Sequence, residues 1–129
     1  IALAAVLGGV FAEGIDLPPG ALSAVVILGP GLPPVGLERT LLQAALHERY
    51  GQGFLYASII PGMTRVTQAL GRLIRRPEDR GAIVLLDDRF TQRAFRTLLP
   101  DDLQPTVTAD PVPALRDFFG PLTPAATSD

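Results

Sequence analysis

Four polar side chains at helical spacing could together bind an anion. Arg65, Gln68, Arg72 and Arg75 follow one another at i, i+3, i+7 and i+10. At about 100° per residue they fall within an arc of roughly 80°, on one face of a helix that we predict to begin at Pro61 and run to about Arg75. Guanidinium groups are planar and suit phosphate or carboxylate. The spacing therefore predicts a cationic row that could hold such a group.

Two interpretations of this row remain open. The segment 61–76 contains no acidic residue, and repulsion between like charges on one helix costs about 0.2–0.5 kcal/mol per pair, which an anionic ligand would offset. Gly71 lowers helix propensity by about 1 kcal/mol relative to Ala, so we expect another backbone or a ligand to approach closely there. Alternatively, arginines near a helix C-terminus complement the helix dipole and form only a solvated face.

Composition limits the classes of function that the chain can have. Its 129 residues are 47% hydrophobic and 19% charged, which is enough for the core of one domain and unlike a disordered chain. The net charge of −2 conceals a segment, 61–96, with eight arginines and four acids, against three arginines and nine acids elsewhere. With no cysteine and with His47 as the single histidine, thiolate or histidine metal sites within the chain are excluded, and we predict no metal ligands here.

Other charged or glycine-rich positions carry weaker signals. Asp87 and Asp88 follow a predicted strand, where α/β proteins place their sites, although capping the next turn is the more frequent role. We predict that His47 is a surface histidine. Gly29-Pro30-Gly31 lacks the length, lysine and hydroxyl residue of a phosphate loop.

The elements that would position these residues alternate between strands and helices. We expect an α/β fold with a partial parallel sheet flanked by helices. Strands are predicted at 24–28 and 82–86, at 1–7 with helix as a competitor, and weakly near 106–108; helices are predicted at 37–50, 61–75, 91–98 and 110–119. A doubly wound sheet normally has more strands, so we interpret the chain as part of a larger domain.

The row and its surroundings resemble a known family. Gln68-Ala69-Leu70-Gly71-Arg72-Leu73-Ile74-Arg75, then Pro77-Glu78-Asp79-Arg80-Gly81 and the strand ending Leu86-Asp87-Asp88-Arg89-Phe90, resemble motif VI and its sequel in the XPD/DinG family of superfamily 2 ATP-dependent DNA helicases. Residues 9–19, with Glu13-Gly14-Ile15-Asp16, are similar to motif V of that family. The resemblance covers about residues 1–103.

The resemblance implies a fold and a set of roles. Residues 1–119 would form the C-terminal part of the second RecA-like domain, a fragment of a P-loop NTPase-type helicase domain, and 120–129 a flexible tail. Arg72 and Arg75 would reach the γ-phosphate of ATP, with Arg75 as the arginine finger. The implied ATP-binding residues are Gln68, Gly71, Glu13, Gly14 and Asp16. Arg65 is a candidate for nucleic-acid contact.

The same resemblance implies cofactors and partners outside the chain. The parent protein would use ATP with Mg²⁺, whose ligands lie in the N-terminal RecA-like domain, and could carry an iron–sulfur cluster in sequence absent here. It would move along single-stranded DNA, mostly 5′ to 3′. It would be cytoplasmic and would not bind a membrane, and the fragment alone would be inactive. The alternatives are an RNA helicase and a non-enzymatic α/β module that binds nucleic acid or an acidic partner.

Two features of the sequence bear on contact with nucleic acid. The loop at 29–34 lacks the lysine and phenylalanine that many relatives carry there, which weakens the case for DNA contact by this loop. Phe54 and Tyr56 are candidates for base stacking, but core packing is the favoured interpretation for both.

Overall fold

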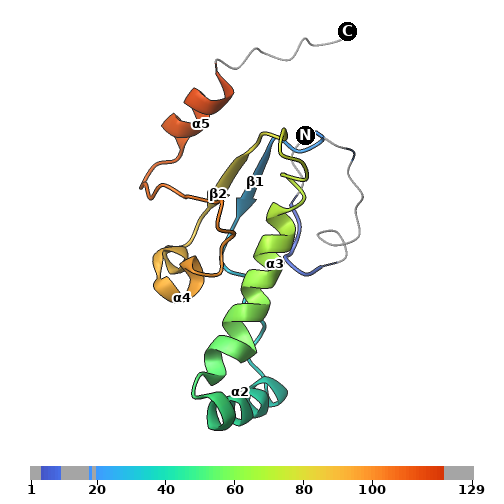
Figure 1. Cartoon of the computed structure of the whole chain (residues 1–129), viewed down its shortest axis with the longest axis vertical. Coiled ribbons are helices and arrows are strands. Elements are labelled where there is room, and N and C mark those ends of the chain that lie inside the picture. The colour runs from blue at the N-terminus through green and yellow to red at the C-terminus, as the bar shows by residue number, and fades with distance from the viewer. Residues whose placement is uncertain (1–3, 10–17, 19, 121–129) are drawn as a thin grey trace.

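The computed structural model describes residues 4–9, 18 and 20–120. Within them the chain forms a two-stranded sheet, three longer helices and several short helical turns (Figure 1). In chain order these are β1 (Ala24–Ile27), α2 (Leu37–Tyr50), a π-helix (Leu55–Ile59), α3 (Ile60–Leu70), β2 (Ala82–Leu85), a 3-10 helix (Asp88–Thr91), α4 (Arg93–Arg96) and α5 (Val112–Phe119). The predicted α/β fragment with a partial parallel sheet is confirmed.

The two strands pair in parallel, from Ala24 opposite Ala82 to Ile27 opposite Leu85. Their apolar, β-branched residues suit a pleated surface, and alternate side chains point to opposite faces. Ile27 is buried at 3% exposure on the face that α3 covers, whereas Val26 on the other face is 54% exposed. One face of the sheet is therefore packed and the other is largely open.

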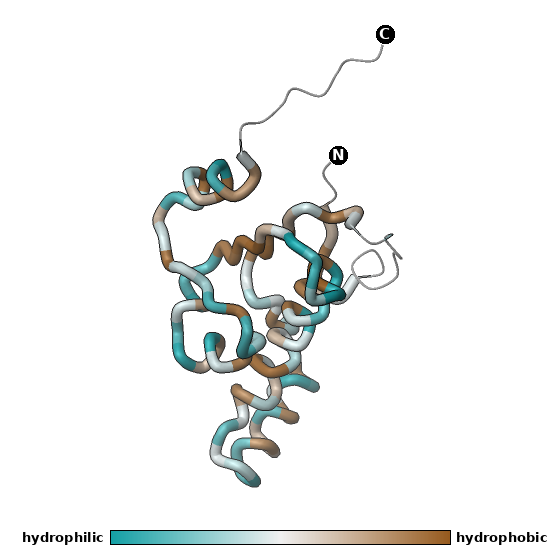
Figure 2. The backbone as a smooth tube through the Cα atoms, turned by 45° about the horizontal axis from the view of Figure 1, so that its top comes forward, coloured by the Kyte–Doolittle hydropathy of each residue, from teal (hydrophilic) through white to brown (hydrophobic). Residues whose placement is uncertain are grey.

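The hydrophobic core lies between the sheet, α3 and the segment around α4. Val66 and Met63 on α3 are essentially inaccessible, at 0% and 1%. The buried core comprises Ile27, Ile59, Met63, Val66, Leu70, Phe90, Phe95 and Leu99. The tube in Figure 2 shows brown, hydrophobic residues alternating with teal ones along the helices, as expected for elements that bury one stripe.

Helix α3 ends at Leu70, five residues before the predicted end at Arg75. Gly71 weakens the helix, and tighter i to i+3 bonds follow, from Arg72 N–H to the Ala69 carbonyl and from Leu73 N–H to the Leu70 carbonyl. The prediction of a longer helix was wrong because glycine and the downstream turn end it. Beyond the end of the helix Leu73 is still buried, whereas Ile74 is 38% exposed.

Two strand predictions were also wrong. The described part of the first segment, residues 4–9, is a loop with a turn closed by the Gly9 N–H and the Val6 carbonyl, and residues 106–108 are irregular. The helix predicted at 91–98 is shorter than expected, because only Arg93–Arg96 is α-helical and a 3-10 helix, Asp88–Thr91, precedes it. The two paired strands and α5 lie within two residues of their predicted bounds, and α2 has the predicted bounds. Among the described residues, no helix has the length and apolar character needed to cross a membrane.

Candidate anion-binding site

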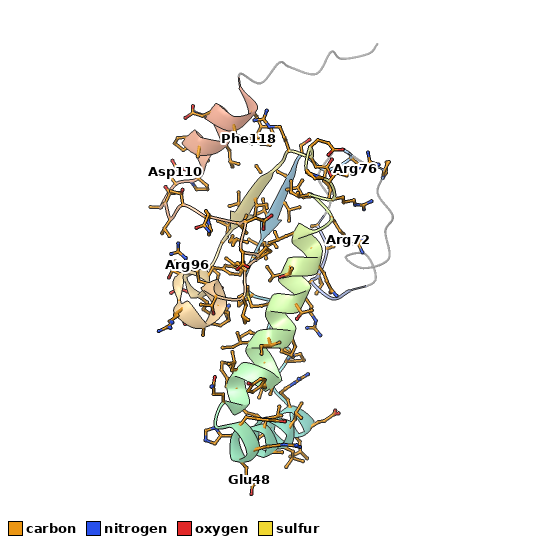
Figure 3. All side chains as sticks on the ribbon, viewed as in Figure 1. Glu48, Arg72, Arg76, Arg96, Asp110 and Phe118 are labelled. Atoms are coloured by element: carbon orange, nitrogen blue, oxygen red, sulfur yellow. The ribbon has the colours of Figure 1, made fainter. Side chains whose placement is uncertain are left out.

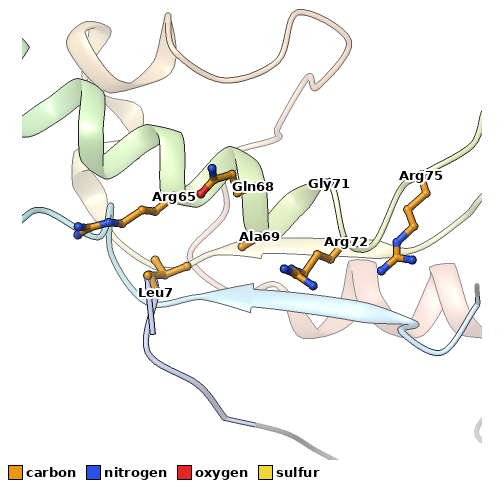
Figure 4. Close-up of a pocket in the computed structure, with 8 residues that line it drawn as sticks. Leu7, Arg65, Gln68, Ala69, Gly71, Arg72 and Arg75 are labelled. Atoms are coloured by element: carbon orange, nitrogen blue, oxygen red, sulfur yellow. The ribbon is translucent and has the colours of Figure 1, made fainter. Parts of the chain in front are cut away.

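A pocket of about 470 Å³ lies along the C-terminal half of α3 and the turn after it (Figure 4). It is lined by Leu7, Gly8, Arg65, Gln68, Ala69, Gly71, Arg72 and Arg75. The structure thus gathers all four residues of the predicted row in one site, although α3 ends before the last two. Figure 4 shows Arg72 and Arg75 beyond the helix, with Arg65 at the other end of the row.

Arg65 is positioned by the fold itself. Its Nη1 donates a hydrogen bond of 3.3 Å to the Gly31 carbonyl oxygen, and its side chain is half-buried. A Cβ at Gly8 would lie 2.9 Å from Arg65 Nε, and Gly8 has φ of +79°. Glycine at this position therefore leaves room for the guanidinium stem, and Arg65 has a structural role as well as a place in the pocket.

Arg75 is held through its backbone. The Asp79 carboxylate oxygen Oδ2 accepts the N–H groups of Arg75 and Arg76, at 2.8 and 2.9 Å. Such an acidic cap stabilises a turn that departs from the helix. Since Arg75 is exposed and Arg72 is half-buried, the turn presents two guanidinium groups at the mouth of the pocket.

Gly71 lines the pocket, but neither its backbone conformation nor its neighbours require a glycine there. Its φ of −64° and ψ of −9° suit any L-residue. An added Cβ would meet only the Thr67 and Gln68 carbonyl oxygens, at ordinary contact distances of 3.5 and 3.7 Å. The expected close approach of another backbone is therefore absent among the described residues, and the expectation of a ligand stays a prediction.

Asp87 and Arg89 form a separate ion pair at the carboxyl end of β2. Arg89 Nε and Nη2 donate to the two Asp87 oxygens at 2.9 and 2.7 Å, and the Arg89 N–H also donates to Asp87. The hydrogen bond from the Arg89 side chain, chiefly, lowers the pKa of Asp87 from 3.8 to about 2. Asp87 caps the 3-10 helix, so the capping interpretation is confirmed for this residue.

The other predicted site residues lie elsewhere. Glu13, Gly14 and Asp16, together with the tail at 121–129, fall outside the described residues. His47 is exposed on α2, as predicted. In the part of the chain that the structure describes, no group of three histidine, aspartate or glutamate side chains could hold a metal ion.

Sequence reasoning missed three lining residues, Leu7, Gly8 and Ala69. We assigned Leu7 to a strand and gave Gly8 and Ala69 no part in the site. The paired glycines at 8 and 9 were the available signal, because a glycine with positive φ often marks a close approach.

The region that contains this pocket is similar to known proteins. Residues 1–106 match the family described as "Helicase C-terminal domain". The chain is 34% identical over 102 residues to "ATP-dependent DNA helicase DinG" of Photobacterium profundum, which covers 75% of the chain and 14% of that protein. It is 33% identical over 112 residues to human "Regulator of telomere elongation helicase 1", covering 80% and 9%.

A third relative is "ATP-dependent DNA helicase chl-1" of Caenorhabditis elegans, 34% identical over 100 residues, with 75% of the chain and 12% of the relative covered. The chain therefore spans only a small part of the length of each relative. The matched region, 1–106, contains the whole pocket. The chain belongs to the helicase C-terminal domain family, and its relatives are those of the XPD/DinG type that the motif around Arg72 resembles.

Proposed function

We propose that this chain is part of an ATP-dependent DNA helicase and that its pocket receives the γ-phosphate of ATP bound by another domain. The single observation that supports this most is the gathering of Arg65, Gln68, Arg72 and Arg75 along one pocket, within the region that matches the helicase family. The phosphate-binding loop would come from an N-terminal RecA-like domain of the same protein. This chain has no lysine, so it cannot supply the lysine of such a loop.

Each residue then has a distinct role. Arg75, exposed at the mouth, acts as the arginine finger and meets charge that develops on the transferred phosphoryl group, a contribution of about 10³ to 10⁵ in rate. Arg72, set deeper, contacts the γ-phosphate, and Gln68 helps to position the nucleotide. Gly71 leaves the space into which the phosphate oxygens approach. Mg²⁺ would be bound by the other domain and would neutralise charge between the β- and γ-phosphates.

Motif V would link the nucleotide site to the DNA. Glu13, Gly14 and Asp16 would contribute there, and Arg65 is the candidate for contact with the strand. ATP binding would close the two domains and hydrolysis would open them, so that the protein moves along single-stranded DNA, mostly 5′ to 3′. Any iron–sulfur cluster would lie outside this chain, which has no cysteine.

The test is a substitution of the finger in the complete protein that carries this chain. Arg75→Ala should reduce ATP hydrolysis by at least about 10³-fold while ATP binding changes little, because the finger acts mainly in the transition state. Arg75→Lys should restore little, since a lysine cannot reproduce the planar fork. The matched control is Arg116→Ala, which removes an exposed arginine from α5.

Two results would contradict the proposal. Unchanged turnover in Arg75→Ala would remove this residue from the role, and equal losses in both variants would mean that the effect is one of net charge. Stimulation of hydrolysis by single-stranded RNA but not by DNA would favour an RNA helicase. The isolated 129-residue chain should hydrolyse no ATP, and we expect it to be poorly soluble because its sheet would present an uncovered edge.

A further inference from the structure

Three aromatic side chains gather on the surface where α2 meets the π-helix. Tyr50, Phe54 and Tyr56 are 52%, 49% and 42% exposed. The expectation that Phe54 and Tyr56 pack in the core was therefore wrong. They include both tyrosines of the chain. Because these rings are exposed, packing in the core does not explain their position, and a ligand could contact them.

The rings of the two tyrosines lie in contact range of each other, and the guanidinium group of a neighbouring arginine lies in contact range of one of them. The ring centroids of Tyr50 and Tyr56 are 5.4 Å apart with an interplanar angle of 49°. The Arg49 guanidinium carbon lies 5.3 Å from the centroid of the Tyr50 ring, within cation–π range. We call Arg49, Tyr50 and Tyr56 the aromatic platform.

The backbone beneath the platform is closely packed. Gly51 ends α2 with φ of +72°, and its N–H donates to the His47 carbonyl. A Cβ at Gly53 would overlap the Gln43 carbonyl oxygen and the His47 side chain. The backbone at Gly53 therefore lies directly against α2. Arg39 Nη1 also donates a 2.7 Å hydrogen bond to the Ala57 carbonyl. These contacts hold the backbone segments that carry Tyr50 and Tyr56 against each other.

We propose that the aromatic platform stacks bases of single-stranded nucleic acid, an inference that rests on the proposed helicase function. Aromatic rings and guanidinium planes both stack on bases, and the guanidinium adds attraction to the phosphate backbone. The last turn of α2 carries His47 and Arg49 as its basic residues, beside Glu48. The surface thus combines ring faces with a cation, which is the pattern of sequence-tolerant strand binding.

The platform lies far from the arginine pocket. Figure 3 shows Glu48, in the last turn of α2, at the bottom of the molecule and Arg72 beyond the upper end of α3. Tyr56 and Leu70, the last residue of α3, are fourteen positions apart, or roughly 20 Å along a helix, and Arg72 lies beyond that end. The nucleotide site and the platform can therefore be occupied at the same time.

The test compares two probes of equal backbone charge, using the complete protein that carries this chain. The first is a thymidine oligonucleotide of about 15 nucleotides, and the second is an abasic oligonucleotide of the same length. Fluorescence anisotropy gives the dissociation constant for each. Tyr50→Ala/Tyr56→Ala should weaken binding of the thymidine probe about fivefold or more and leave the abasic probe unaffected, because only bases can stack.

Two further variants make the result specific. Tyr50→Phe/Tyr56→Phe keeps the rings and should bind both probes as the wild type does. Phe119→Ala removes an aromatic ring that is 45% exposed on α5 and should also leave both affinities unchanged. Circular dichroism melting establishes that each variant is folded, and ATP hydrolysis without DNA should be the same in all of them.

The proposal is overturned if the double alanine variant binds the thymidine probe as tightly as the wild type, or if both probes weaken equally. In either case the exposed rings serve another purpose, such as contact with a protein. Failure of the helicase proposal is seen separately, as absence of ATP hydrolysis by the wild type, whereas failure of the platform is seen only in the ratio of the two dissociation constants.

Discussion

Gly71→Ala should separate folding from function at the arginine pocket. The backbone at Gly71 is in the right-handed helical region, and an added methyl group would meet nothing closer than 3.5 Å. Alanine also restricts the unfolded chain, which stabilises a protein by about 0.4–1 kcal/mol at a compatible site. We therefore expect the free energy of unfolding to be unchanged or slightly higher, by about 0.5 kcal/mol.

The same methyl group should harm catalysis. Gly71 lines the pocket between Gln68 and Arg72, so a Cβ would occupy the space that we assign to the phosphate oxygens. A small shift of the phosphoryl group away from the arginines should lower ATP turnover by about tenfold or more. This is equivalent to about 1.4 kcal/mol of lost transition-state stabilisation. The assays are thermal unfolding and steady-state ATP hydrolysis on the complete protein.

Two glycine variants calibrate this experiment. Gly36→Ala places its Cβ in open space and should leave ATP turnover unchanged; because Gly36 is the N-cap of α2 and alanine is a poorer cap, it should lower the free energy of unfolding by at most about 1 kcal/mol. Gly62→Ala places its Cβ 2.5 Å from the Pro30 carbonyl oxygen and should lower the free energy of unfolding by about 1–3 kcal/mol through overpacking. The reasoning is refuted if Gly71→Ala lowers stability as much as Gly62→Ala does, or if Gly71→Ala leaves ATP turnover unchanged.

Two other predictions concern stability. Met63 is 1% exposed at the centre of the core, so Met63→Ala should lower the free energy of unfolding by about 2–5 kcal/mol, measured by urea unfolding; a loss below 1 kcal/mol would contradict the core assignment. Asp87→Ala should cost about 1–2 kcal/mol at neutral pH through loss of a cap and a partly exposed ion pair. Because Arg89 lowers the pKa of Asp87 from 3.8 to about 2, the stabilisation from its ionisation is complete above about pH 4 and is lost as the pH falls toward 2. A difference between wild type and Asp87→Ala that stays constant from pH 5 to about 2 would contradict this linkage.

Local chemistry in the sequence was sufficient for the elements with strong periodicity. The paired strands contain runs of Ala, Val, Ile and Leu, and α2 is bounded by Gly36 and Gly51. Both signals act within a few residues, so no distant contact was needed to predict them. The family followed from the Gln68 to Arg75 motif for the same reason, because it is one continuous stretch.

Predictions failed where distant contacts decide the structure. The helical wheel was extended to Arg75, but the Asp79 carboxylate binds the Arg75 and Arg76 N–H groups and supports a turn instead. Residues 4–9 form a loop beside Arg65, which an apolar run could not reveal. Phe54 and Tyr56 were assigned to the core by hydrophobicity alone, yet the close approach of Gly53 to α2 places them on the surface. The four residues of the predicted row nevertheless line one pocket, since the turn keeps Arg72 and Arg75 on its side, and their roles stay a prediction.

The π-helix at Leu55–Ile59 has a consequence for how this region can change in length. A π-turn holds one residue more than an α-turn, and each residue added to or removed from an α-helix rotates what precedes it by about 100°. A deletion within 55–59 could therefore leave α3 and its arginines in register with the sheet while it swings α2 around the helix axis. The number of residues in this short stretch therefore sets the angle between α2 and α3.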